Sequence, residues 1–255
     1  MSALRASQCN LAPRFAGVYN SKLPHLTREI DFQYDSAMTA RNLTYFKINT
    51  WRRGAPTINK STGGLRKTKG VVYNKSVVAS LAYRGCCKLI DAISGTVHNY
   101  GSKNHLLAEI FATPKGCGWS KDRQRLANVM EAAENRNDSR IGREIVTVCP
   151  DGMKPNTFIS EVTAYTHWLQ KRYRTTIVAD IHDPHKDNPN PPKTGRNLHV
   201  HITVPTREVT PQGMGVKLRE LDDLNYSRHE VNDMRREWAL AMERGFKQQG
   251  ENIEF

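Results

Sequence analysis

The pattern of apolar and polar positions predicts short strands and helices that follow one another between about residues 42 and 250. Residues 42–50 (NLTYFKINT) alternate as a half-buried strand does, and residues 76–83 (SVVASLAY) predict a small apolar helix capped by Ser76. Further strands are expected at residues 144–148, 175–182 and 198–204, the last two separated by a loop rich in proline, asparagine and aspartate.

Three longer segments have the period of amphipathic helices. They cover residues 120–135, a stretch from a cap at Asn156 to about residue 171, and a last helix that opens with a capping box from Ser227 to Glu230. The last two strands are joined by a loop and not by a helix. We therefore expect an α+β fold whose central antiparallel or mixed sheet is covered by helices on one face.

Composition narrows the classes of protein that the chain can belong to. The chain has 255 residues, enough for one domain. It contains no run near the roughly 20 apolar residues of a membrane span, and its first residues lack the apolar run of a secretory signal. We therefore predict a cytoplasmic protein without a membrane segment.

The five cysteines are odd in number, include the adjacent pair Cys86 and Cys87, and form no metal-ligand spacing, so we expect them to be reduced bystanders.

The charge is strongly positive and unevenly distributed. Lys and Arg number 38 against 25 Asp and Glu, a net charge of +13, and no acidic residue lies between Asp35 and Asp91. This excess predicts a polyanionic partner, most often nucleic acid. We divide the chain into an N-terminal extension (1–41), a main domain (42–250) with a basic loop at 52–70, and a tail (251–255).

Three histidines form the most specific pattern. His199 and His201 flank one residue of a predicted strand, so their side chains lie on the same face. His182 ends the preceding strand on the side of Asp180. If these strands pair antiparallel, three imidazoles can converge on one cation, although a His-x-His pair alone is often just an exposed polar pair. Imidazole suits transition metals, whereas phosphate-processing sites more often hold magnesium or manganese.

A cation on three neutral ligands can polarise a phosphate oxygen for nucleophilic attack. The sequence has no Gly-x-Ser-x-Gly elbow, no phosphate-binding P-loop and no zinc deaminase signature. Tyr83, which is followed by Arg84 in the most cationic part of the chain, is a candidate nucleophile. A tyrosine at a helix end is also a common packing residue.

Three blocks of sequence resemble the mobilisation relaxases of the MobA/MobL type, members of the His-hydrophobe-His (HUH) endonucleases. The first is SVVASLAYRGCCKLID (76–91), followed by HNY (98–100). The second is the histidine block from IHDPHK to NLHVHITVPTRE (181–208), and the third is GMGVKLRELDD (213–223). The blocks stand in the family order within about residues 42–250.

The resemblance implies a relaxase-like fold and a role for each matched residue. Tyr83 would be the nucleophile, and His182, His199 and His201 would bind a divalent metal ion, magnesium or manganese. Glu144 would orient a histidine or accept the tyrosine proton, although the residue alone can equally be a solvent-facing strand glutamate. Tyr100 is the rival tyrosine, but it lacks the sequence frame of the family nucleophile.

The activity that the resemblance implies is that of a plasmid mobilisation relaxase, a DNA nickase and strand transferase. Its substrate would be single-stranded DNA at an origin of transfer, and its other partners would be accessory mobilisation proteins and the coupling protein of a conjugation system. Trp51 is expected to stack on unpaired bases. The expected contacts to phosphate groups are Arg84, Arg207, Lys217 and Arg219.

The sequence alone is compatible with two other functions. A rolling-circle replication initiator or transposase of the same superfamily would use the same tyrosine and histidines. A non-catalytic nucleic-acid-binding protein could keep the basic loop and leave the histidines exposed. The Arg-Glu-Leu-Asp sequence at residues 219–222 favours the relaxase.

Overall fold

The computed structural model describes residues 45–251, except 55–56, 59–60, 63, 67–70, 73–74, 137 and 193–194. The expected N-terminal extension, nearly all of the tail and much of the basic loop therefore lie outside the described residues. Within the part described, no helix is both long and apolar enough to cross a lipid bilayer.

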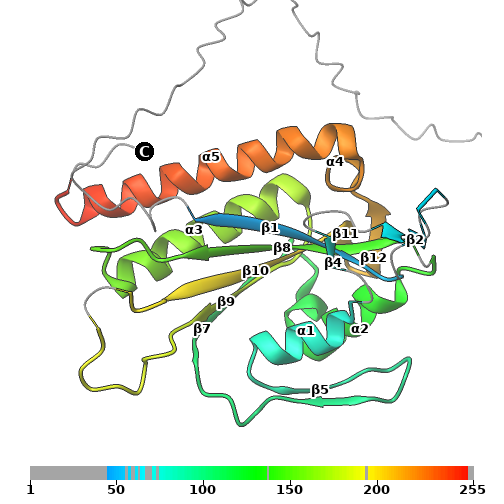
Figure 1. Cartoon of the computed structure of the whole chain (residues 1–255), viewed down its shortest axis with the longest axis horizontal. Helices are drawn as coiled ribbons and strands as arrows, with labels where there is room; N and C mark the ends of the chain where they lie inside the picture. Colours follow the sequence, from blue (N-terminus) through cyan, green and yellow to red (C-terminus); the bar gives the residue numbers. More distant parts are fainter. Residues whose placement is uncertain are drawn as a thin grey trace, which may run out of the picture. The chain divides into compact units, whose positions relative to one another are not determined.

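A six-stranded sheet forms the centre of the fold (Figure 1). Its strands, in spatial order, are β4 (Val71–Val72), β1 (Phe46–Arg52), β8 (Arg140–Val148), β10 (His199–Pro205), β9 (Ile177–His182) and β7 (Leu106–Ala112). All neighbouring strands are antiparallel except β1 and β4, which are parallel. The expected mixed sheet and α+β class are confirmed.

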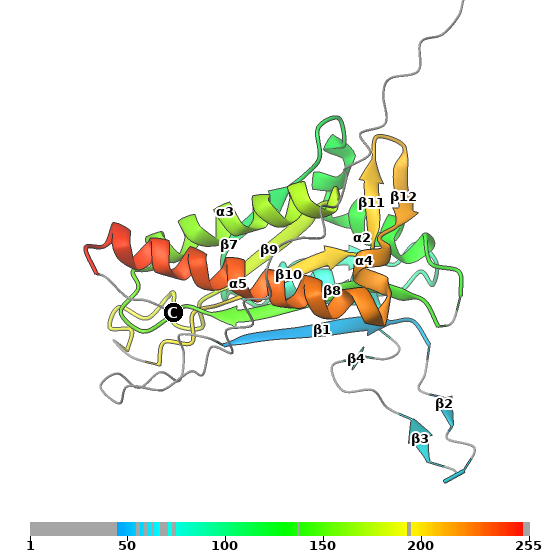
Figure 2. The ribbon, with the colours of Figure 1, turned by 90° about the horizontal axis from the view of Figure 1, so that it is seen from above.

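Helices cover both faces of this sheet, and not one face as the sequence predicted. Helices α3 (Pro155–Tyr173) and α5 (Leu224–Gln248) lie on one side, and α1 (Val77–Arg84) and α2 (Arg123–Ala132) lie on the other (Figures 1 and 2). The prediction failed because the strands are apolar on their second face as well. Trp51 of β1 and Val178 of β9 pack there with α1 and α2 in a separate hydrophobic cluster.

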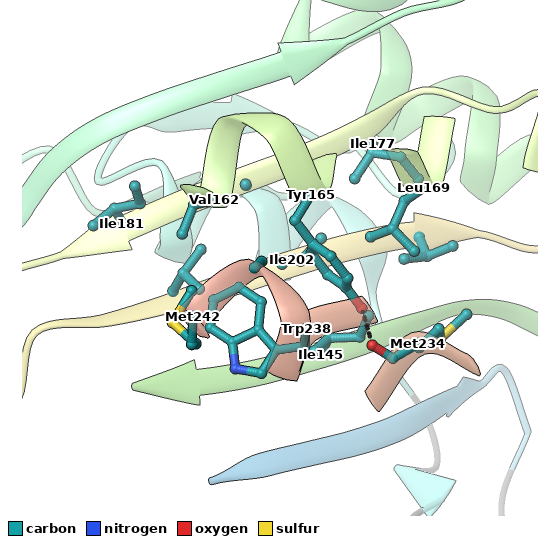
Figure 3. Packing of buried hydrophobic residues seen from close by; sticks show 14 of the residues in the cluster. Ile145, Val162, Tyr165, Leu169, Ile177, Ile181, Ile202, Met234, Trp238 and Met242 are labelled. Carbon is teal, nitrogen blue, oxygen red and sulfur yellow. Dashed lines mark hydrogen bonds between the residues drawn. The ribbon is translucent and has the colours of Figure 1, made fainter. Parts of the chain in front are cut away.

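The larger hydrophobic core lies between the sheet and helices α3 and α5 (Figure 3). Ile177, Ala179 and Ile181 of β9 alternate towards it, which leaves the even-numbered residues of that strand for the opposite face. Tyr165 and Trp238 pack edge to face, with ring centroids 5.2 Å apart, and the buried Tyr165 hydroxyl donates a hydrogen bond to the Met234 carbonyl. This core fixes the phase of the strands that carry the histidines.

The helix starts are only partly those that the sequence predicted. Ser76 caps α1, its Oγ accepting a hydrogen bond from the Ala79 N–H at 3.1 Å, as expected. However, α3 begins at Pro155, whose fixed φ suits the first turn, and not with a cap at Asn156. Helix α5 begins at Leu224, before the expected capping box at Ser227.

The smaller elements were not predicted from the sequence. They are η1 (Gly118–Lys121), α4 (Arg219–Asp222) and three two-stranded sheets, β2 (Thr57–Ile58) with β3 (Leu65–Arg66), β5 (Lys88–Ile90) with β6 (Val97–Asn99), and β11 (Arg207–Thr210) with β12 (Gly213–Lys217).

Truncating Trp238 tests the α3/α5 core. Trp238→Ala is expected to lower the free energy of unfolding by about 3–5 kcal/mol, because it removes a large buried side chain and leaves a cavity. Leu240→Ala, an exposed position of the same helix, should change it by less than about 0.5 kcal/mol. Urea unfolding followed by far-ultraviolet circular dichroism measures both, and equal effects would contradict this account of the core.

Candidate active site

Antiparallel pairing of β9 and β10 brings the three histidines together. His182 pairs directly with His199, and His201 follows two residues later on the same face as His199. The ring centroids lie 5.1–5.3 Å apart, and one ligand atom from each residue lies within 4.8 Å of the others. The donor set therefore fits one divalent cation.

Hydrogen bonds fix which nitrogen of each ring is free. The Nδ1 atoms of His199 and His201 lie 2.6 Å from the Asn197 carbonyl and 2.9 Å from a Glu144 oxygen, respectively. Both partners are acceptors, so each Nδ1 carries the proton and each Nε2 keeps its lone pair. His182 is bonded the other way round, with Nε2 2.7 Å from the Arg84 carbonyl. Its lone pair therefore lies on Nδ1.

Burial keeps two of these rings neutral. It lowers the pKa of His182 to about 3, and the neighbouring histidines contribute in the same direction. It also lowers the pKa of His199 below its usual value. A neutral imidazole has a lone pair for a cation, so near pH 7 a proton does not compete for these ligands.

Glu144 of β8 lies beneath His201 and is buried. It accepts hydrogen bonds from His201, from the Arg84 guanidinium, and from Asn49 Nδ2 at 3.3 Å. Burial alone would raise the pKa of Glu144, but the His201 hydrogen bond and the Arg84 charge outweigh it and lower the pKa to about 2. Glu144 is therefore an ionised acceptor that orients His201.

Two residues expected to contact DNA are buried in this site. Arg84 is only 4% exposed, and its guanidinium donates to Glu144 and to the Thr203 hydroxyl. Trp51 is fully buried, with the Arg84 guanidinium 4.5 Å from its ring centroid and its own Nε1 3.5 Å from Glu144. The structure therefore contradicts the expected base stacking by Trp51, and it places Arg84 where it supports Glu144.

Tyr83 is the last residue but one of α1, and it is 42% exposed although its helix packs into a core. The Tyr100 ring meets it edge-on at 5.3 Å between centroids, and Lys103 Nζ lies 4.2 Å from its ring centroid. Tyr83 and Tyr100 both line a cavity of about 460 Å³ together with Lys75. A polyanion can therefore reach Tyr83 beside cationic side chains.

His105 connects Tyr83 to the histidine cluster, and no pattern in the sequence pointed to this residue. Its ring centroid lies 6.3 Å from that of Tyr83 and 4.4 Å from that of His182. It stands immediately before β7, outside every motif block. Only the pairing of β7 with β9 brings it here.

Asp180 was expected on the side of His182, and it does lie there. It is fully buried and is paired with Arg123 of α2, which also binds Glu109 at 2.9 Å. Its carboxylate is thus neutralised by a guanidinium.

The three other predicted phosphate contacts lie at the opposite end of the sheet (Figure 1). Strand β10 carries His199 and His201 at its start, and Arg207 follows its end, at most about 20 Å from His201 along the chain at 3.3 Å per residue. Arg207 and Lys217 both bind Glu134, at 2.8 and 2.6 Å, whereas the Arg219 side chain is 82% exposed. All three line one cavity of about 460 Å³ with Arg136.

The profile of the MobA/MobL family matches residues 75–254, which include Tyr83, Glu144 and the three histidines. The chain belongs to the MobA/MobL family. This result confirms the resemblance seen in the sequence.

A curated relative and a solved structure are similar to this chain. "Mobilization protein MobL" of Acidithiobacillus ferridurans is 28% identical to this chain over 177 residues. The match covers 63% of this chain and 46% of the relative, so this chain spans about half of the relative's length. A solved structure described as "Molecular Basis of Vancomycin Resistance Transfer in Staphylococcus aureus" matches 82% of this chain and 95% of that chain, with a TM-score of 0.61 and 17% identity. The second likeness shows a shared fold.

The buried His182 predicts a pH dependence of stability. In the unfolded chain the pKa of His182 is about 6.5, whereas in the folded protein it is about 3. Between these pH values the unfolded state binds more protons, so protonation favours unfolding. The free energy of unfolding should therefore decrease as the pH falls from about 6.5 towards 3. Chemical denaturation in the presence of chelator should show a smaller decrease in His182→Asn than in the wild type. His167→Asn, at an exposed position of α3, should keep the wild-type slope, and an unchanged slope in His182→Asn would contradict the assignment.

Proposed function

We propose that the protein is a mobilisation relaxase that nicks one DNA strand at a plasmid origin of transfer. One observation carries the proposal: an exposed tyrosine lies next to the ring of His105, which adjoins a cluster of three histidines whose rings are oriented for a cation. Membership of the MobA/MobL family and the printed name of the curated relative support the same function.

His182, His199 and His201 would hold a divalent ion, magnesium or manganese, which would stabilise charge on the scissile phosphate. The residues present fit such an ion, because all three ligand atoms can converge and one ring is backed by a carboxylate. Glu144 is a positioning residue in this proposal. Its oxygens are already engaged with His201, Arg84 and Asn49, which supports this role over that of acceptor for the tyrosine proton.

The chemical step belongs to Tyr83. Its Oη forms a bond to the phosphorus as the 3′-oxygen of the neighbouring nucleotide leaves, so the DNA strand is broken and a 5′-phosphotyrosine is formed. The phenol proton is lost and the leaving oxygen gains one. Because one phosphoester replaces another, a free 3′-hydroxyl can reverse the attack and rejoin the strand after transfer.

Two cationic regions would bind the single-stranded DNA, one beside Tyr83 and one at the far end of the sheet. Lys75 and Lys103 lie beside Tyr83 and can contact phosphates next to the nick. Of the three cations at the far end, Arg219 is the most available, because Arg207 and Lys217 are held by Glu134. Accessory mobilisation proteins and a coupling protein remain partners that we propose from the family.

Replacing Tyr83 tests the nucleophile. The protein is incubated with manganese and with 3′-labelled single-stranded oligonucleotides that tile the transfer region of its source replicon. Wild type and Tyr100→Phe are expected to carry label after denaturation, and Tyr83→Phe should carry none, because phenylalanine lacks the attacking oxygen. Chelator should abolish the adduct. An adduct that persists in Tyr83→Phe and disappears in Tyr100→Phe would move the nucleophile to Tyr100.

Replacing Glu144 tests the support of the histidines. Glu144→Gln keeps an acceptor for His201 but removes the charge, so nicking at limiting manganese should fall about 10–100-fold while DNA affinity stays unchanged. Glu109→Gln changes a carboxylate on the same face that pairs with Arg123 and not with a histidine, so it is the matched control. An equal loss in both variants would show that Glu144 has no specific role.

A further inference from the structure

A second group of metal-ligating side chains adjoins the three histidines. Cys86 follows α1, and its Sγ lies 3.5 Å from His105 Nε2. The His105 ring centroid lies 4.4 Å from that of His182, and one ligand atom from each of the three residues lies within 4.8 Å of the other two. His182 therefore belongs to both clusters.

The spacing of Cys86 and His105 matches that of ligands on a tetrahedral metal ion. With bonds of about 2.3 Å to sulfur and 2.05 Å to nitrogen, the two ligand atoms of a tetrahedral zinc site lie about 3.6 Å apart. The observed separation of 3.5 Å needs almost no movement to accept such an ion. His182 is buried, and Cys86 and His105 are partly exposed, so an ion can enter from solvent.

The backbone holds Cys86 in an unusual conformation. Its φ is +47°, in the left-handed region that non-glycine residues seldom adopt, and its N–H donates to the Tyr83 carbonyl at 3.3 Å. The next residue, Cys87, packs instead against the core of α1 and α2. Strained residues of this kind concentrate at functional sites, and here the strain falls on the cysteine of the cluster.

We propose that Cys86, His105 and His182 form a second cation site, selective for a thiophilic divalent metal such as Zn²⁺. A thiolate ligand adds one negative charge and prefers softer ions, whereas the three-histidine cluster offers only neutral imidazoles. On binding, the sulfur–metal bond forms and the thiol proton is released to solvent. Magnesium binds sulfur ligands poorly, so it would not suit this site.

The shared histidine makes the two sites alternatives. His182 donates its Nε2–H to the Arg84 carbonyl, so it has a single lone pair to offer, on Nδ1. An ion held by Cys86 and His105 would therefore remove one ligand from the three-histidine cluster. The consequence for nicking rests on the proposed relaxase function, whereas the binding site itself does not.

Cobalt binding to the full-length, reduced protein tests the site directly. Co²⁺ replaces Zn²⁺ in such sites and gives a near-ultraviolet thiolate-to-cobalt charge-transfer band. The band is expected in wild type, in His199→Ala, and in Cys87→Ser, the matched control one residue away. It should be absent in Cys86→Ser. When His199→Ala has already disrupted the three-histidine cluster, adding Cys86→Ser or His105→Ala should lower the Zn²⁺ affinity at least about 100-fold, more than the loss of an outer-shell partner causes.

A band that survives Cys86→Ser, or that needs Cys87 as much as Cys86, would overturn the proposal. So would the absence of any band in wild type. The unsubstituted protein provides a second measurement that does not depend on the folding of a variant. Zn²⁺ should protect Cys86 from alkylation, read by peptide mass spectrometry, and should leave Cys149 alkylated at its metal-free rate. Equal or no protection would contradict the site.

Competition between the sites is measured separately. Zn²⁺ should inhibit manganese-supported nicking in wild type and in Cys87→Ser, and Cys86→Ser should resist this inhibition at the same Zn²⁺ concentration. If wild type shows the cobalt band but no nicking with any metal, the relaxase function fails and the second site stands. If nicking occurs and no band forms, the second site alone fails.

Discussion

Glu144 accepts hydrogen bonds from residues that come from three different parts of the chain, and the site depends on this one carboxylate. His201 reaches it from β10, Arg84 from the end of α1, and Asn49 from β1. The backbone carbonyl of Arg84 in turn accepts the Nε2–H of His182. Through its bonds to His201 and Arg84, the carboxylate thus fixes a histidine on each of two neighbouring strands together with the helix that carries Tyr83.

A second buried ion pair has a similar arrangement two strands further along the sheet. Arg123 of α2 binds Asp180 of β9 and donates to the Leu81 carbonyl of α1 at 3.1 Å. Buried pairs of this kind need not stabilise a protein relative to an apolar core, but removing one partner leaves a costly isolated charge. The two pairs therefore fix where α1 and α2 lie on the histidine face of the sheet. Apolar packing alone would not fix these positions, because it is non-directional.

The sequence was sufficient for some local features. Strand alternation correctly placed His199 and His201 on one face, and the Ser76 cap set the start of α1. Two other local predictions were wrong, because α3 and α5 begin before their expected caps. The remaining failures concern contacts between distant residues. The burial of Arg84 depends on Glu144, 60 residues away, and the position of His105 depends on the pairing of β7 with β9. Neither leaves a periodic trace in the chain, and so neither could be predicted from it.

The last turn of α1 places two consecutive residues in opposite surroundings. Arg84 is held by a carboxylate and a hydroxyl inside the protein, whereas the ring of Tyr83 stands at the surface. The backbone of the tyrosine is consequently anchored by its neighbour, and its remaining freedom is rotation about the two side-chain bonds that carry the ring. In the proposed reaction, a strand of DNA attached to this ring would move towards the histidine cluster or away from it by torsion alone, with no rearrangement of the helix.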